Sequence, residues 1–249
     1  KVSCFSGDRF SVYKETRKRL NGLRNIHLGK RCFLIGNGPS VNLNDLQLVQ
    51  DDITFCCNRF HLCYENTLFR PNYIVSADDF MIKDFGKEIC TSANSFNQKS
   101  FFGMVHNPHQ YLEDSKNVFW LRLNRRRPFL FSQNIQNSLG TGGASLIFAS
   151  QIAYHMGIKE MYLYGIDHKF DYNVSITSSS LASAVGDGNH FIKNYRSGKK
   201  WVPPSVSLIE NSFKSLDCFL RNNNGSILNC SRFSELPYIK KVPFDSVVR

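Results

Sequence analysis

The stretch GDGNHFIKNYRSGKKW, residues 186–201, is polar, rich in Gly and Lys, and contains one histidine, His190. An imidazole can take a proton from a hydroxyl group near neutral pH, and polar segments of this kind form lids over active sites. His190 is therefore a candidate general base. His168, which directly follows the carboxylate of Asp167, is the competing candidate.

Two glycines separated by one residue follow an apolar run in CFLIGNGPS, residues 32–40. Gly36 and Gly38 allow a ligand to approach the backbone closely, and Asn37 and Ser40 can hydrogen bond to a phosphate or a ribose. The pattern lacks the third glycine of a dinucleotide-binding motif and the Lys-Ser/Thr pair of a Walker loop. It therefore predicts either a phosphate-binding turn or a tight turn with a structural role alone.

A second glycine motif lies within SLGTGGASLIFASQIAYHMGIKEMYLYGID, residues 138–167. Thr141-Gly142-Gly143 precede a helical pattern, and a helix N-terminus binds anions through its unpaired backbone N–H groups. Asp167 follows a strand pattern, where a carboxylate can accept hydrogen bonds from ribose hydroxyls or a base. The alternatives are close helix–sheet packing at the glycines and a capping role for Asp167.

Positive charge is the other chemical feature of the chain, whose net charge is +11. Lys and Arg are concentrated in residues 1–31 and in NRRRPF, residues 124–129. Such clusters attract anionic substrates or an anionic membrane surface, and a solvated helix face explains them equally well. No zinc-finger or RNA-recognition pattern is present, so nucleic acid is not an expected partner. The eight cysteines lack metal-ligand spacing, and we expect no metal or cofactor.

The chain alternates between apolar strand patterns and helical patterns, and these elements must position the candidate residues named above. We expect strands at Cys32–Ile35, Ile53–Cys57, Tyr73–Ser76, Phe101–Val105, Val118–Leu123, Met161–Tyr164 and Ser226–Asn229. We expect helices at about 9–25, 42–50, 142–156 and 205–222. Strands that are apolar on both faces and alternate with helices predict an α/β fold with a doubly wound, mostly parallel sheet. Ligands bind such sheets beyond the carboxyl ends of the strands, which is where both glycine motifs fall.

Five motifs taken in order resemble the bacterial sialyltransferases of glycosyltransferase family forty-two: FLIGNGPS, FCCNRF, TGG at a helix start, GIKEMYLYGID, and a histidine in a polar loop. The order is also similar to that in the wider group of Maf-type flagellin glycosyltransferases and archaeal hydroxymethylpterin pyrophosphokinases. The similarity runs from about residue 31 to residue 235. It implies a Rossmann-like, single-domain variant of the GT-A type, which binds a CMP-activated nonulosonic acid without a metal.

The charge pattern indicates a basic N-terminal helical segment over residues 1–30, and the polar composition indicates a lid at about 173–200. The resemblance implies a nucleotide-sugar-binding domain over residues 31–249. His190 would deprotonate the acceptor hydroxyl, while Lys169 and Tyr172 would stabilise the departing CMP. Asn37 and Asn58 would contact the nucleotide or the donor sugar. The substrate-binding residues that we expect are Gly36, Asn37, Gly38, Ser40, Asn58, Thr141, Gly142, Gly143 and Asp167.

The chain departs from the sialyltransferase pattern at two places. An aromatic hydroxyl follows GID closely in that family, whereas this chain has His168 and Lys169, with Tyr172 as the nearest tyrosine. Glycine also replaces the middle residue of the family's TSG triplet. Kdo or another ulosonic acid therefore fits as a donor as well as sialic acid does.

Two other functions are compatible with the sequence. A pterin pyrophosphokinase needs Mg²⁺ held by carboxylates, and Asp78, Asp79 and Asp167 lie at expected strand ends. A non-catalytic nucleotide- or glycan-binding module would bind its ligand without turnover.

The expected partners are a CMP-activated acidic sugar and a glycan or glycolipid acceptor, with the acceptor bound by loops at 78–117 and 173–200. We expect a cytoplasmic protein whose basic N-terminal segment is a candidate contact with the inner face of the membrane. The sequence leaves open whether the chain forms a homo-oligomer.

Overall fold

The structure, a computed structural model, describes residues 5–105, 108–110, 115–129, 131–170, 182–183, 188–196 and 198–248. Its helices are α1 (Phe5–Asn21), α2 (Leu43–Leu48), α3 (Asp79–Ser95), α4 (Ser145–His155) and α5 (Val206–Asn222), with short 3₁₀ helices η1 (Phe60–Cys63), η2 (Pro108–Gln110) and η3 (Phe244–Ser246). Its strands are β1 (Arg31–Ile35), β2 (Ile53–Cys57), β3 (Tyr73–Ser76), β4 (Lys99–Gly103), β5 (Val118–Leu121), β6 (Leu123–Asn124), β7 (Leu139–Gly140), β8 (Glu160–Tyr164), β9 (Ala182–Ser183), β10 (Lys200–Trp201) and β11 (Ser226–Asn229).

A seven-stranded sheet in the order β11-β8-β1-β2-β3-β4-β5 forms the centre of the molecule. Each neighbouring pair in it is parallel. The strands consist of short apolar runs whose side chains alternate between two buried faces, so that Phe33 and Ile35 lie on one side and Cys32 and Leu34 on the other. This arrangement confirms the Rossmann-like α/β fold with a doubly wound, mostly parallel sheet.

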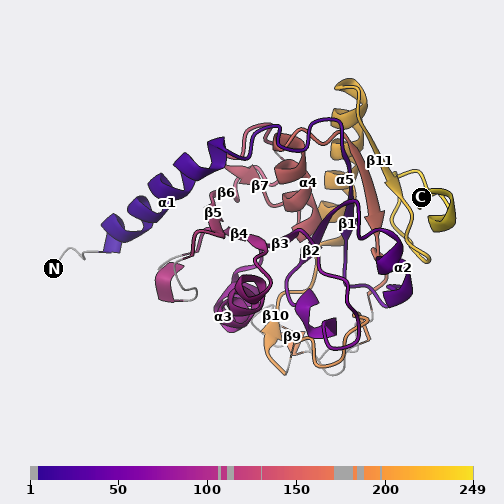
Figure 1. The fold of residues 1–249 in the computed structure, drawn as a ribbon, viewed down its shortest axis with the longest axis horizontal. Coiled ribbons are helices and arrows are strands. Elements are labelled where there is room, and N and C mark those ends of the chain that lie inside the picture. The colour runs from indigo at the N-terminus through magenta and orange to yellow at the C-terminus, as the bar shows by residue number, and fades with distance from the viewer. Residues whose placement is uncertain are drawn as a thin grey trace.

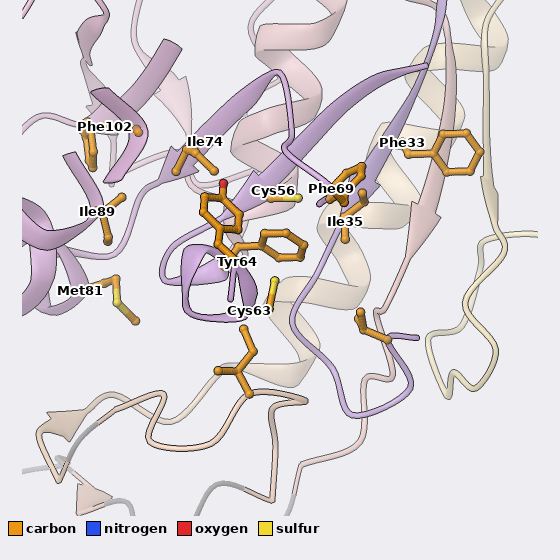
Figure 2. Packing of buried hydrophobic residues seen from close by; sticks show 14 of the residues in the cluster. Phe33, Ile35, Cys56, Cys63, Tyr64, Phe69, Ile74, Met81, Ile89 and Phe102 are labelled. Carbon is orange, nitrogen blue, oxygen red and sulfur yellow. The ribbon is translucent and has the colours of Figure 1, made fainter. Parts of the chain in front are cut away.

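Helices cover both faces of the sheet. α2 and α3 pack against the face that carries Phe33, and α4 and α5 pack against the opposite face. Figure 2 shows Met81 and Ile89 of α3 beside Ile74 and Phe102 of the sheet, with Tyr64 and Cys63 completing this core. Since both faces are buried, all binding groups must lie at the ends of the strands or on the connecting loops.

α1 covers the edge of the sheet at β5. The Arg19 guanidinium donates hydrogen bonds to the backbone carbonyls of Lys116 and Val118, at 2.7 and 2.8 Å. A sheet edge exposes unpaired backbone groups, and this side chain satisfies some of those of β5. Figure 1 shows the N-terminal half of α1 projecting away from the sheet.

The structure corrects the expectation that residues 78–117 form loops, because the helix α3 occupies Asp79–Ser95. Asp78 caps α3 by accepting hydrogen bonds from the backbone N–H groups of Phe80 and Met81. The helix contains residues of low helix propensity, namely Gly86 near its centre and most of the Thr-Ser-Ala-Asn-Ser run at its end. They weaken the helical pattern in the sequence. The buried stripe that includes Met81, Phe85 and Ile89 outweighs that propensity.

The remaining boundaries differ from expectation by a few residues. The expected strand at Val118–Leu123 ends at Leu121, and the one at Phe101–Val105 begins at Lys99. In the described part of the chain, no helix combines the length and the apolar content that a membrane span requires.

Candidate functional site

The order of the sheet places the two glycine motifs side by side. β1 and β8 are neighbours, and their register sets Ile35 opposite Tyr164, so Gly36 and Gly165 follow at the same edge. The chain leaves β1 toward β2 on one side, while β8 lies on the other, which makes this position the topological switch point of the sheet. Ligands bind open α/β sheets at such points.

Close backbone contact explains the glycines of both motifs. A β-carbon on Gly36 would stand 2.5 Å from the carbonyl oxygen of Gly165, and one on Gly38 would stand 2.8 Å from both that oxygen and Cγ of Asp167. Gly165 itself has a φ of +68°, where L-residues are strained. The glycines of the GNG turn therefore have the structural role that was the alternative to phosphate binding, because they allow the two loops to come into contact.

Asp167 links the same two loops. Its carboxylate accepts a 2.8 Å hydrogen bond from the backbone N–H of Ser40 and a second from the Ser40 hydroxyl. Burial raises the pKa of the Asp167 carboxyl, and the two hydrogen bonds from Ser40 oppose that shift. Asp167 thus caps the GNGPS turn, as the structural alternative for it predicts, although it also lines the cavity described next.

A cavity of about 600 Å³ opens at the switch point. Its lining includes these residues of the expected set: Gly36, Asn37, Gly38, Asn58, Thr141, Gly143, Asp167, Lys169 and His190. Ser40 and Gly142 are not among the lining residues in the described part of the chain, since Ser40 faces Asp167 and Gly142 packs against Ile147. Tyr172 lies outside the described residues, as does half of the expected lid at about 173–200.

His190 is held against the glycine turn through Tyr195. The two rings are stacked, with centroids 3.8 Å apart and planes 15° apart. The Asn37 amide donates to the Tyr195 hydroxyl at 3.0 Å and to the Cys57 carbonyl at 3.0 Å. Burial raises the pKa of the Tyr195 hydroxyl well above its ordinary value, so this hydroxyl is neutral at physiological pH.

The backbone of the His190 segment is anchored at two further points. The N–H of Phe191 donates to the Asn37 carbonyl at 3.0 Å. Arg59 donates to the carbonyls of Asn194 and Tyr195 at 2.9 and 2.6 Å, and it also contacts the Glu88 carboxylate of α3 at 2.8 Å. The residue that follows Asn58 in FCCNRF therefore fastens the histidine segment to a helix of the core.

The start of α4 faces the cavity. Ala144, Ser145 and Leu146 line it, and no side chain in the described part of the chain caps the N-terminus of this helix. Within the described residues, the backbone N–H groups of Ser145 and Leu146 donate no hydrogen bond, since the first one in the helix runs from Ile147 to Ala144. Two aligned N–H groups at a helix N-terminus are a binding site for a phosphate or carboxylate oxygen.

Lys169 and His168 lie at the rim and the wall of the cavity. The Lys169 ammonium stands 5.7 Å from the centre of the Phe233 ring and is exposed. His168 is nearly buried and contacts Glu210 of α5. No local pattern could have predicted Glu210 or the Arg59–Glu88 pair, because these contacts span 42 and 29 residues of the chain.

The three carboxylates considered for Mg²⁺ have other partners. Asp78 caps α3, Asp167 caps the GNGPS turn, and Asp79 pairs with Arg125 at 2.6 Å. Among the described residues, no three His, Cys, Asp or Glu side chains form a group that could hold a metal ion.

Comparison with known proteins finds a solved structure with a similar fold. No family model matches the chain, and no curated protein does. The fold superposes on a solved MAf glycosyltransferase from Magnetospirillum magneticum AMB-1 with a TM-score of 0.53 and 14% sequence identity. The match covers 95% of this chain and 39% of the other, so this chain spans well under half of that protein's length. At this identity the chain is similar to that glycosyltransferase in its fold.

Proposed function

We propose that the chain is a glycosyltransferase that moves an acidic nonulosonic sugar from CMP to a hydroxyl group of a glycan acceptor. The observation that carries the proposal is the cavity at the switch point, where an imidazole, a glycine turn and an uncapped helix N-terminus meet. The fold shared with a MAf glycosyltransferase supports the reaction class. Support for CMP as the nucleotide comes from the sequence resemblance.

In the proposed reaction, His190 takes the proton of the acceptor hydroxyl as its oxygen attacks the anomeric carbon of the sugar. The bond from that carbon to the phosphate oxygen breaks, and its electron pair leaves with CMP. The N–H groups of Ser145 and Leu146 stabilise the growing negative charge on the phosphate, and Lys169 contributes from the rim of the cavity. Tyr172 is proposed for the same task on the sequence resemblance alone. Fixed donors of this kind supply the largest part of many catalytic effects because they need no reorganisation.

Tyr195 and Asn37 orient His190 in this scheme. The stacked Tyr195 ring fixes the plane of the imidazole, and the Asn37 amide fixes the position of the tyrosine hydroxyl. Gly36, Gly38, Ser40 and Asp167 keep the glycine turn in place, and Asn58, Thr141 and Gly143 complete the wall that faces the donor.

Calorimetric titration with CMP, CDP, UDP and ATP, each with and without Mg²⁺, tests the proposal. We expect metal-independent binding that is selective for CMP, followed by CMP release from a CMP-linked acidic sugar. Mg²⁺-dependent binding of ATP would overturn the proposal and direct mutagenesis to Asp78, Asp79 and Asp167. Saturable CMP binding without turnover of CMP-linked sugars would reduce the proposal to a binding module.

A further inference from the structure

His168 has an unusual backbone and, among the residues that the structure describes, a single polar partner. Its φ is +51°, in the left-handed region that non-glycine residues seldom adopt. Its side chain is 4% exposed, its Nε2 lies 3.1 Å from Oε1 of Glu210, and its ring meets Phe170 edge-on at 5.5 Å. A strained backbone that directs a buried imidazole at a carboxylate is a feature of functional sites.

His168 lines the same cavity as the N-terminus of α4. Glu210 follows Leu208 and Ile209 in α5, and both of these side chains pack on Gly143, where a β-carbon would stand 3.1 Å from each. Gly143, Leu208, Ile209 and His168 all line the same cavity. The imidazole therefore shares a wall with the unpaired N–H groups of Ser145 and Leu146.

The contact with Glu210 determines which nitrogen of His168 can act on a ligand. Nε2 of His168 is held by the Glu210 carboxylate. The other ring nitrogen, Nδ1, has no hydrogen-bond partner within the described residues and is therefore the one that can act on a ligand. An imidazole that carries a proton on each ring nitrogen can donate from both, so one N–H can serve Glu210 and the other a ligand. The pair can therefore present a proton on Nδ1 to an anion in the cavity.

We propose that His168, held by Glu210, protonates the departing nucleotide phosphate, which rests on the function proposed above. As the bond between the anomeric carbon and the phosphate oxygen breaks, that oxygen receives the bonding electron pair and takes the proton from Nδ1 of His168. The acceptor proton goes to His190, so one imidazole gains a proton while the other loses one. Exchange with water then restores both.

Two histidines with different supports suit these two tasks. His190 is stacked on a neutral aromatic ring, whereas Nε2 of His168 contacts the Glu210 carboxylate.

The test compares CMP with cytidine, which lacks the phosphate. Calorimetric Kd values are measured at pH 6 for the wild type, His168→Gln and Glu210→Gln. His27→Gln serves as the control, since His27 contacts the Tyr73 hydroxyl at 2.7 Å, away from the cavity. A charge-assisted hydrogen bond to phosphate accounts for about a 10- to 100-fold change in affinity. We expect His168→Gln to weaken CMP binding by that factor and to leave cytidine binding unchanged, with a smaller loss for Glu210→Gln.

The outcomes separate this inference from the proposed function. If the wild type prefers CMP to cytidine and His168→Gln keeps that preference, the phosphate role is wrong while the proposed function stands. An equal loss for both ligands would assign His168 a structural role only. A wild type that binds neither ligand would overturn the proposed donor and this inference together. Circular dichroism checks that each variant folds, and Glu210→Gln gives a second reading should His168→Gln not fold.

Discussion

Gly38 carries a hydrogen atom where any other residue would carry a carbon, and the site depends on that difference. A β-carbon on Gly38 would point at the Gly165 carbonyl and the Asp167 carboxylate, which belong to the loop that follows β8. Two loops separated by about 130 residues therefore fit together only because their closest positions have no side chains.

Gly38→Ala should destabilise the fold by about 1–3 kcal/mol, because the new methyl group overlaps backbone and a hydrogen-bonded carboxylate. Urea denaturation measures the change in the free energy of unfolding. Gly22→Ala is the matched control, since its β-carbon would have only an ordinary contact of 3.4 Å with the Arg19 carbonyl. Equal stability of the two variants would show that the loops can separate without cost.

His190→Ala should lower turnover of a CMP-linked sugar by about 10²–10⁴-fold, the usual contribution of a general base. CMP affinity should stay within about twofold of the wild type, because His190 acts on the acceptor. Initial rates at saturating donor give the first quantity and calorimetry the second. Unchanged turnover would exclude His190 as the base.

Among the elements, the segment 188–196 depends on η1 and α3 for its position. Arg59 stacks on Phe85 with its guanidinium carbon 4.1 Å from the ring centre, pairs with Glu88, and donates to two carbonyls of the segment. A single buried side chain thus transmits the rigidity of a core helix to the segment that carries His190.

Arg59→Leu should free this segment while the sheet stays intact. We expect amide hydrogen exchange over residues 188–196 to accelerate by about 10-fold or more, since each hydrogen bond from a charged donor contributes about 1.5–3 kcal/mol. Arg70→Leu is a close match as a control, because Arg70 also donates to backbone carbonyls and stacks 4.1 Å from an aromatic ring, that of Tyr64. If both variants left exchange in the segment unchanged, Arg59 would not be its anchor.

The sequence predicts the elements well where a local pattern exists. The strands at Ile53–Cys57, Tyr73–Ser76 and Ser226–Asn229 lie where their β-branched and aromatic runs indicate. The switch point also follows, because parallel strands bring every loop after a strand to one edge. The sequence did not predict the helix α3, which follows Asp78, and no sequence pattern could predict the Arg59–Glu88 and His168–Glu210 pairs. Tertiary packing selects these pairs, and single-chain periodicity carries no information about them.

At the scale of the whole molecule, charged pairs fasten the C-terminal segment to the sheet. Arg232 contacts Asp45 of α2 at 2.7 Å, and Asp45 also accepts a 2.5 Å hydrogen bond from the Tyr164 hydroxyl of β8. Burial raises the pKa of Asp45, but the hydrogen bonds from Arg232 and Tyr164 outweigh it and lower this pKa below its ordinary value. Residues 187 positions apart are joined by this contact.

Arg232→Met should destabilise the protein at pH 7 by about 2–4 kcal/mol. That is slightly below the cost of breaking a fully buried pair, because the Arg232 side chain is 41% exposed. A lowered folded-state pKa stabilises the fold above the unfolded-state value of about 3.9, and this contribution is lost as pH falls through the folded-state value. The difference between variant and wild type should therefore shrink in acid.

Chemical denaturation at pH 7 and pH 3 measures this difference. Arg221→Met is the control, because its pair with Asp217 is exposed and contributes less than about 1 kcal/mol. A difference that is independent of pH would mean that Arg232 stabilises the fold through packing on Phe244 rather than through Asp45.

The cover that α1 gives to β5 sets an order of events during folding. α1 is synthesised before β5, and Arg19 can satisfy the carbonyls of β5 only once Val118, 99 residues later, is in place. Until that contact forms, the edge of β5 is open and can recruit a second copy by adding one strand to another. Removal of residues 1–22 would leave this edge open in the folded chain. We expect such a chain to form oligomers that grow with protein concentration in sedimentation experiments, whereas the intact chain passes through that stage only while it folds.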